Sequence, residues 1–305
     1  MNNFILLVAC FVLGMLLRAS GRLPDNAPAA LNGFVVNVSL PALTLSTVHA
    51  LQPDPKLLFA AAMAWVLFAV GVAFFWVAGR LLKLSRATTG ALMLTGSLAN
   101  TSFIGLPMIE MWWGPSFVGI GIVADQLGSY FVLSTLGIVL AGTYAGGQGP
   151  RVNARAVARK ILTFAPFVSL LVALALMPVA YPDWLDALLR RLGATLVPLA
   201  LVSVGFQLRL SEMRGRLPLL ALGLGFKLVL APALILLLYA GVLGQRGSLI
   251  QISVFEAAMG PMIGAAIIAM DHDLDPSLVT LMVGIGIPLS FATLPAWWWV
   301  LQGFG

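Results

Sequence analysis

One apolar run that is long enough to cross a membrane is interrupted near its middle by polar residues, glycine and proline. The run covers Ala87–Trp113, and the interruption contains Asn100, Gly105 and Pro107. Lipid cannot bond free backbone N–H and C=O groups, so an irregular stretch at membrane depth must be buried in protein or line a watery cavity. Transporters build substrate sites from such broken helices. A plain proline-kinked helix is the alternative, because membrane helices tolerate kinks.

Composition places the chain in a membrane. It has 60% hydrophobic and 9% charged residues, whereas soluble proteins average about 25% charged residues. The single cysteine, Cys10, excludes a disulfide within one chain. The N-terminus lacks the positive region of a cleaved signal peptide, so we expect the first helix to be retained. Ten apolar runs, the first of them short, are candidate spans: Phe4–Leu17, Ala27–Leu51, Leu57–Gly79, Ala87–Trp113, Ser116–Thr143, Ile161–Val179, Leu188–Leu208, Leu217–Leu243, Ser248–Met270 and Ser277–Leu301.

The cations are distributed unequally between the two sides that ten spans define. One side receives twelve: Arg18, Arg22, Arg80, Lys83, Arg86, Arg151, Arg155, Arg159, Lys160, Arg209, Arg214 and Arg216. The other receives Lys56, Arg190, Arg191 and Arg246. The positive-inside rule places the twelve in the cytoplasm and both termini outside, in a multi-pass protein of the cytoplasmic (inner) membrane. The basic residues thus explain topology, and they form no aromatic-interleaved face for nucleic acid.

The two halves of the chain resemble each other at a nearly constant offset. Pro41 pairs with Pro198, 157 positions later, and Thr135 pairs with Thr293, 158 positions later. That spacing carries the first interruption onto a second one, at Gly260–Gly264. Five spans per half is an odd number, so the repeats must be inverted in the membrane. We predict ten transmembrane helices in two inverted repeats, 1–143 and 161–305, joined by a cytoplasmic loop over 144–160, with broken helices 4 and 9 crossing.

Three ionisable residues lie deep within the predicted spans, where such groups are costly and face a cavity or a partner. Asp125 is in the fifth span beside Gln126, Lys227 is in the eighth, and Glu256 is in the ninth, just before Gly260 and Pro261. In one interpretation Lys227 forms an inert structural ion pair with Asp125 or Glu256. In the other, Asp125 or Glu256 is a coupling group that binds H⁺ or Na⁺.

The predicted breaks favour an anionic ligand. A half-helix N-terminus presents unpaired N–H groups and the positive end of its dipole. Lys227 would add positive charge, and Asn100, Thr101 and Ser102 would offer hydrogen-bond partners without a charge cost. These features predict a small organic anion as substrate. A cation exchanger, in which the same N-termini compensate Asp125 and Glu256, is the alternative.

Other conspicuous residues indicate no chemistry. The tryptophans at 112–113 and 297–299 are typical of an interfacial belt, and His49 is expected at an interface. The acidic cluster Asp271–Asp275 has one histidine and no second ligand set, so we expect a solvated loop and no metal site. No motif of an enzyme occurs, and no cofactor is expected apart from a coupling ion. A membrane receptor is a further alternative, against which the lack of an appended cytoplasmic domain counts.

The interrupted fourth span resembles a known signature. Leu98-Ala-Asn-Thr-Ser-Phe-Ile-Gly-Leu-Pro107 is similar to the fourth-helix motif of the auxin efflux carrier family, which includes plant PIN-type carriers and bacterial organic-acid permeases. Glu256-Ala-Ala-Met-Gly-Pro-Met262 resembles the family's second crossover, with Gly260 where a proline is common. The resemblance extends over essentially the whole chain, and the short central loop is closer to the bacterial permeases.

This resemblance implies a fold similar to bile acid symporters and sodium/proton antiporters. A scaffold of spans 1, 2, 6 and 7 would hold a mobile transport domain of spans 3–5 and 8–10. Family members move carboxylates such as auxin, malonate or malate, commonly as homodimers. By motif position, Asn100, the Gly105–Pro107 break and the Gly260-Pro261 break carry over to the substrate site. Asp125, Lys227 and Glu256 rest on their burial and charge alone.

Overall fold

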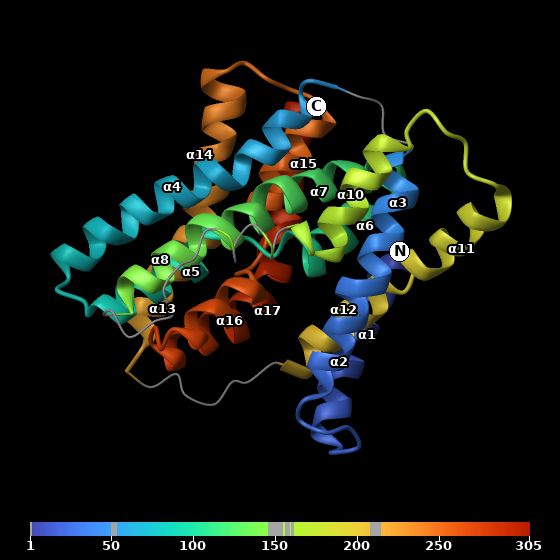
Figure 1. Cartoon of the computed structure of the whole chain (residues 1–305). Coiled ribbons are helices and arrows are strands. Elements are labelled where there is room, and N and C mark those ends of the chain that lie inside the picture. The colour runs from blue at the N-terminus through green and yellow to red at the C-terminus, as the bar shows by residue number, and fades with distance from the viewer. Residues whose placement is uncertain (1, 50–53, 146–154, 156–158, 160–161, 208–214) are drawn as a thin grey trace. The chain divides into compact units, whose positions relative to one another are not determined.

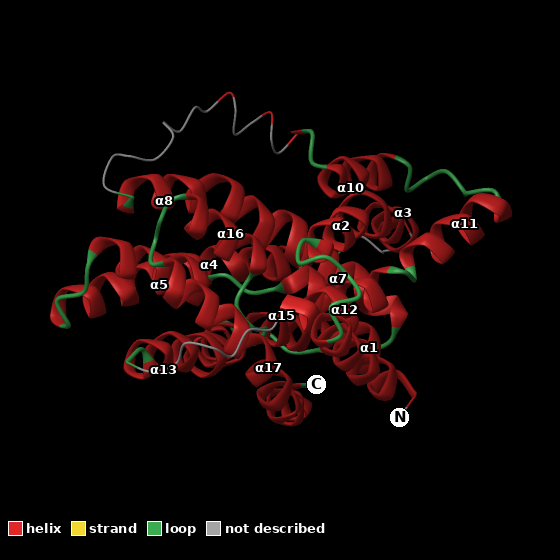
Figure 2. Cartoon of the chain, turned by 90° about the horizontal axis from the view of Figure 1, so that it is seen from below, coloured by secondary structure: helices red, strands yellow, loops and turns green. Residues whose placement is uncertain are grey.

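The chain folds as helices throughout the part that the structure describes. The computed structural model describes residues 2–49, 54–145, 155, 159, 162–207 and 215–305 (Figure 1). Within these ranges the regular structure is helical, and extended pairing is confined to one isolated bridge (Figure 2). The all-α prediction is therefore confirmed. Most of the connecting loop predicted over 144–160 lies outside the described residues, as do four of the cations assigned to the cytoplasmic side, Arg151, Lys160, Arg209 and Arg214.

Two compact units make up the chain, and each draws on separate parts of the sequence. The first unit consists of residues 1–54, 102–122 and 159–208, and the second of 55–101, 123–158 and 209–305. The second unit contains most of the polar residues discussed above. The grouping into two five-helix repeats stays a prediction, because contact within units does not test it.

Six described helical stretches are long and apolar enough to cross a membrane. They are Ala27–Val48, Leu57–Leu81, Pro115–Tyr144, Asp183–Gln207, Leu217–Val242 and Pro276–Phe304. Shorter apolar helices cover Ala9–Ala19, Ala165–Ala175 and Ser248–Ala257. The predicted fourth and ninth spans fall short because each is divided into half-helices. A multi-pass membrane protein is thus confirmed, while the count of ten spans stays a prediction.

The first unit is organised around a close crossing of α1 (Asn2–Ala19) and α12 (Leu196–Gln207), which lie side by side in both views (Figures 1 and 2). A methyl group on Gly14 would lie 2.1 Å from the Val202 carbonyl oxygen, and one on Gly205 would lie 2.0 Å from that of Phe11. Small residues let membrane helices approach backbone to backbone. Its other described α-helices are α2 (Ala27–Phe34), α3 (Leu40–His49), α6 (Leu106–Trp112), α7 (Val118–Val123), α10 (Ala165–Ala175) and α11 (Asp183–Gly193).

In the second unit, the long helix α4 (Leu57–Leu81) packs on α5 (Arg86–Ser97) and α15 (Ser248–Ala257). Gly71 and Gly79 permit the approach to α5, since a methyl group at either position would collide with Ser97 or Thr89. Its other α-helices are α8 (Ile138–Tyr144), α13 (Leu217–Gly225), α14 (Ala231–Leu236), α16 (Ile263–Asp271) and α17 (Pro276–Leu301). Between them lie π-helical segments Ala124–Tyr130, Leu133–Gly137, Phe226–Leu230 and Leu237–Val242.

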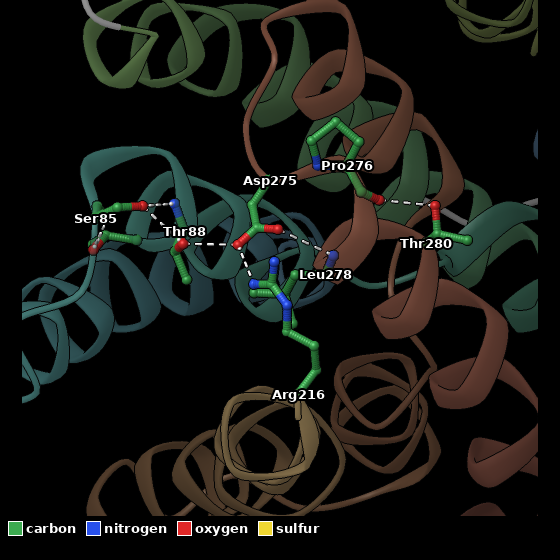
Figure 3. Close-up of polar contacts among 8 residues, drawn as sticks. Ser85, Thr88, Arg216, Asp275, Pro276, Leu278 and Thr280 are labelled. Carbon is green, nitrogen blue, oxygen red and sulfur yellow. Dashed lines mark hydrogen bonds and ion pairs between the residues drawn. The ribbon is translucent and has the colours of Figure 1, made fainter. Parts of the chain in front are cut away.

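One aspartate ties three chain segments together at one end of this unit (Figure 3). Asp275 caps α17 by accepting from the Leu278 N–H at 3.4 Å. Its Oδ2 also accepts 2.7 Å hydrogen bonds from the Thr88 hydroxyl, at the start of α5, and from the guanidinium of Arg216, just before α13. The Asp275 side chain is only 9% exposed, so the interpretation of this residue as part of a solvated loop was wrong. Its φ of 44° is left-handed, a conformation that aspartate and asparagine tolerate best after glycine.

Replacement of Asp275 separates its three tasks. We expect Asp275→Asn to retain the cap through Oδ1 and the left-handed backbone, and to lose the contacts of Oδ2, which are the ion pair with Arg216 and the hydrogen bond from Thr88. Asp275→Ala loses all three and lowers the free energy of unfolding by about 1–2 kcal/mol more than the asparagine variant. Thermal unfolding of the purified protein in detergent measures the difference. Asp271→Ala, at an exposed position four residues away, is the control. Equal losses for Asp275→Asn and Asp275→Ala would contradict the capping role.

Candidate functional site

The interruption of the fourth span lies a few residues earlier than the sequence indicates. Helix α5 ends at Ser97, and Leu98 is extended, with φ −103° and ψ 133°. The chain becomes helical again as a π-helical turn over Thr101–Gly105, followed by α6. Gly105 and Pro107 are therefore helical, and Pro107 lies where the π-helical turn passes into α6. The prediction that the break itself lies at Gly105–Pro107 was wrong.

The second interruption lies where the sequence predicts it. Helix α15 ends at Ala257, and α16 begins at Ile263 with Met262 extended at its start. Gly260 and Pro261 stand in the non-helical stretch between them. Glu256 consequently occupies the last turn of the first half-helix, and the start of the second half-helix follows Pro261 directly.

The two interruptions bond to each other through their backbones. The Asn100 N–H donates to the Gly260 carbonyl at 2.9 Å, and the Met262 N–H donates to the Leu98 carbonyl at 3.1 Å. Ala99 and Pro261 thus form an antiparallel bridge. Unpaired backbone groups cost several kcal/mol each in lipid, and this pairing satisfies four of them. The alternative of an isolated proline kink does not describe this arrangement, because the non-helical stretches of the fourth and ninth spans are hydrogen-bonded to each other.

Asp125 is held beside the first interruption by two neutral donors. The Thr101 hydroxyl donates to Asp125 Oδ1 at 2.6 Å, and the Gln126 amide donates to Oδ2 at 2.9 Å. All three side chains are buried. Asp125 and Gln126 belong to the π-helical segment Ala124–Tyr130, and Trp65 of α4 donates its indole N–H to the Leu127 carbonyl in that segment. Short π-helical insertions are frequent at functional sites, because they re-aim side chains that an α-helix would place elsewhere.

Lys227 and Glu256 both lie at the second interruption. Lys227 lies in another π-helical segment, Phe226–Leu230, and its ammonium donates to the Ala257 carbonyl at 2.6 Å. That carbonyl belongs to the last residue of half-helix α15, at the negative end of its dipole, which a cation stabilises. Glu256 is fully buried and interacts electrostatically with both Asp125 and Lys227. Neither carboxylate oxygen of Glu256 has a hydrogen-bond partner among the described residues.

The predicted site residues divide into two groups. The structure brings Asn100, Thr101, Asp125, Gln126, Gly260 and Pro261 together through the bonds above, with Lys227 and Glu256 beside Ala257. Ser102, Gly105 and Pro107 belong to the first unit instead. They are not among the residues that these bonds connect, and their assignment to the substrate site stays a prediction.

Three residues contribute here to which the sequence alone assigned no role at this site. Ser129 lies four residues after Asp125 in the same π-helical segment, and its buried hydroxyl has no partner among the described residues. Trp65 and Trp297 donate their indole N–H groups to Leu127 and Leu228, carbonyls inside the two π-helical segments. Trp297 therefore does more than mark the membrane interface. The signal for Ser129 was its spacing from Asp125, since residues four apart share a helix face.

A glycine of α17 controls how closely the second interruption approaches that helix. A methyl group on Gly286 would lie 2.7 Å from Pro261 Cδ, and the proline ring cannot turn away. We expect Gly286→Ala to destabilise the protein by about 1–3 kcal/mol, the usual cost of overpacking. Gly225→Ala is the matched control, because its methyl group would meet nothing within 4 Å. Thermal unfolding in detergent measures both, and equal midpoints for the two variants would contradict this packing.

A double-mutant cycle tests whether Lys227 and Glu256 act as a pair. Lys227→Met removes the hydrogen-bond donor of the Ala257 carbonyl and the positive charge near the Glu256 carboxylate. We therefore expect the free energy of unfolding to fall by about 3 kcal/mol. Adding Glu256→Gln removes the stranded charge and should recover at least about 1 kcal/mol. Lys227→Met combined with Thr95→Ala, whose hydroxyl bonds only the Ala91 carbonyl, is the additive control. Strict additivity in both combinations would show that Lys227 serves Ala257 alone.

The protein has many apolar helices, and two of its helices are interrupted and bonded to each other through their breaks, beside buried polar residues. These features define a multi-pass membrane transporter. Comparison with known proteins is consistent with this class. The chain belongs to the auxin efflux carrier family, since the model of that family, described as "Membrane transport protein", matches residues 1–298. The protein is accordingly a transporter and not an enzyme.

Two archaeal relatives align over nearly their whole lengths. An uncharacterised transporter of Methanothermobacter thermautotrophicus is 28% identical over 294 residues, which cover 94% of this chain and 93% of the relative. An uncharacterised transporter of Methanocaldococcus jannaschii is 22% identical over 309 residues, 98% of both chains. The similarity therefore includes both interruptions and the segments that pack against them, and it is not confined to one motif.

Proposed function

We propose that the protein is a secondary active transporter that moves a small organic anion, such as malonate, malate or an auxin-like acid, across the cytoplasmic membrane. The observation that carries the proposal is the backbone pairing of Leu98–Asn100 with Gly260–Met262. It fixes two helix breaks at one place, in a membrane protein whose buried polar side chains gather around them.

The local fields at these breaks favour a negatively charged group. The chain resumes its helical course at Thr101 after the first break and at Ile263 after the second, so two positive half-helix ends begin there. The opposing negative end of α15 is already compensated by the ammonium of Lys227. A carboxylate bound there would therefore accept hydrogen bonds from backbone N–H groups and from the Asn100 amide. Lys227, which bonds the Ala257 carbonyl, would add positive charge nearby.

The buried carboxylates provide the coupling group. Glu256 has no hydrogen-bond donor among the described residues, whereas both oxygens of Asp125 are bonded. A buried carboxylate without donors is costly, and binding H⁺ or Na⁺ relieves that cost. We assign the coupling ion to Glu256, with Asp125 and Gln126 beside it. The coupling cation would reduce the negative charge next to the substrate and so link the two binding events.

Transport would proceed by alternating access. The scaffold of spans 1, 2, 6 and 7 would stay fixed in a homodimer while spans 3–5 and 8–10 carry the substrate, with both termini outside the cell. In this proposal the paired breaks move as one piece, because four backbone groups would otherwise lose their partners.

Uptake of labelled mono- and dicarboxylates into proteoliposomes tests the function. We expect uptake by the wild type under an imposed H⁺ or Na⁺ gradient. Asn100→Ala should reduce it at least about tenfold, the usual effect of losing a hydrogen bond to a charged group. Glu256→Gln should also reduce it at least about tenfold, because the proposed coupling carboxylate is gone. The controls are Thr95→Ala and Ser253→Ala, buried neighbours on α5 and α15 whose hydroxyls bond only their own helices.

The same assay separates the alternatives. Wild-type rates in both Asn100→Ala and Glu256→Gln would refute this placement of the site. Cation flux without carboxylate uptake would favour the exchanger, which the interaction of Glu256 with Asp125 supports as the second candidate. Ligand binding without any flux would favour a receptor.

A further inference from the structure

A second concentration of charge lies away from the paired breaks, in a groove formed by the ends of α4 and α8 and the beginning of α5. The groove has a volume of about 610 Å³ and is open to its surroundings. It is lined by Trp76, Gly79, Arg80, Lys83, Leu84, Arg86, Thr89, Thr143 and Tyr144. All of these residues belong to the second unit. The proposed transport mechanism uses none of them.

The groove is formed by close packing at its base and by the cations at its rim. A methyl group on Gly79 would lie 2.6 Å from the Thr89 hydroxyl, and one on Gly90 would lie 2.7 Å from Tyr144 Cβ. Arg86 bonds the Thr143 carbonyl at 2.7 Å. Lys83 follows α4 with a left-handed φ of 52°, which turns the chain back toward α5. The three helix ends are therefore held at fixed spacing.

Three cations in this groove lack an acidic counterpart. Among the described residues, Arg80, Lys83 and Arg86 take part in no ion pair, and no aspartate or glutamate lines the groove. Like charges gathered without a counterion repel each other and attract an anion.

The aromatic residues hold two of these cations over the groove. The Arg80 guanidinium lies 4.4 Å from the centre of the Trp76 ring, and that of Arg86 lies 5.7 Å from the Tyr144 ring. Cation–π contacts orient a guanidinium without neutralising it, so its N–H groups remain able to bind oxygen. Planar guanidinium groups match phosphate oxygens well.

The neighbouring surface indicates where the anion comes from. Exposed apolar side chains flank the groove at the end of α4: Trp76 is 46% exposed, Leu81 76% and Leu82 57%. In a membrane protein such residues face acyl chains, and a tryptophan beside basic residues is typical of the headgroup level. Basic pockets between transmembrane helices recognise anionic lipid headgroups. A soluble anion would use the cations but gain nothing from the apolar flank.

We propose that this groove binds the phosphate headgroup of an anionic phospholipid, with Arg80, Lys83 and Arg86 as its ligands and the acyl chains along the exposed end of α4. Native mass spectrometry of the purified full-length protein tests the proposal. The probes are phosphatidylglycerol, phosphatidylcholine and inorganic phosphate. The site variant is Arg80→Gln/Lys83→Asn, with asparagine chosen because it tolerates the left-handed backbone.

We expect the wild type to bind phosphatidylglycerol more tightly than phosphatidylcholine. The site variant should lose about thirtyfold in phosphatidylglycerol affinity, since each nearby cation contributes about fivefold. Lys83→Asn alone should lose about fivefold and leaves the Arg80–Trp76 contact intact, which covers the case in which the double variant misfolds. The matched control is Arg22→Gln/Arg191→Gln, which removes two exposed cations elsewhere.

Three results would overturn the proposal. The first is a wild type that shows no preference for the anionic lipid. The second is a control variant that loses as much affinity for phosphatidylglycerol as the site variant does. The third is displacement of phosphatidylglycerol by inorganic phosphate at millimolar concentration, which would make a soluble phosphate the ligand. If the site variant loses lipid affinity but transports carboxylates at the wild-type rate, the proposed function is unaffected. The two proposals can therefore fail separately.

Discussion

The hydrogen bonds between Leu98–Asn100 and Gly260–Met262 are the interaction on which the rest of the structure depends. An interrupted membrane helix exposes backbone groups that lipid cannot bond, so one break alone would be expensive. Two breaks that pair as a short antiparallel bridge satisfy each other. Close packing around the bridge follows from the same need, because Gly286 leaves room for Pro261 against α17. The cost of irregular backbone is thereby offset at the place where the two interrupted helices pair.

Charge is arranged around this bridge so that each group but one has an evident partner. Asp125 accepts from Thr101 and Gln126, and Lys227 donates to the free carbonyl at the end of α15. Glu256 interacts with both ionisable neighbours but accepts no hydrogen bond from a described residue. Buried polar groups without partners are uncommon in proteins and need a reason. A coupling cation at Glu256, next to an anion at the half-helix N-termini, supplies one.

The same side chains explain why the inert ion-pair interpretation is insufficient. Lys227 does lie beside Glu256, as that interpretation requires, but its short bond is to the Ala257 carbonyl. Its structural task is to compensate a half-helix end, and this task exists only because the helix is broken. Structure and proposed function therefore depend on the same break. The π-helical segments that position Asp125 and Lys227 are stabilised in turn by indole donors from Trp65 and Trp297.

Sequence reasoning captured the features that follow from hydrophobicity and from expensive residues. Apolar runs predicted the helices, and Asp125, Lys227 and Glu256 were identified because charge at membrane depth needs a cause. The first break was misplaced because Gly105 and Pro107 are strong helix breakers in isolation. Both are nevertheless helical here, at the passage from a π-helical turn into α6, and the actual break at Leu98–Asn100 depends on a partner 162 positions away, at Pro261. Asp275 was misread for a similar reason, since its partners Thr88 and Arg216 are distant in sequence.

Substrate protection of a single cysteine tests the central claim most directly. The sequence has one cysteine, Cys10, so Cys10→Ser/Ser102→Cys places the only thiol next to the first break. In a variant that still transports, a small water-soluble thiol reagent should label this position, and malonate or another transported carboxylate should slow the labelling. The neutral diamide of the same acid should have no effect. Labelling that no carboxylate slows, but that a coupling cation alone slows, would contradict an anion site at the paired breaks.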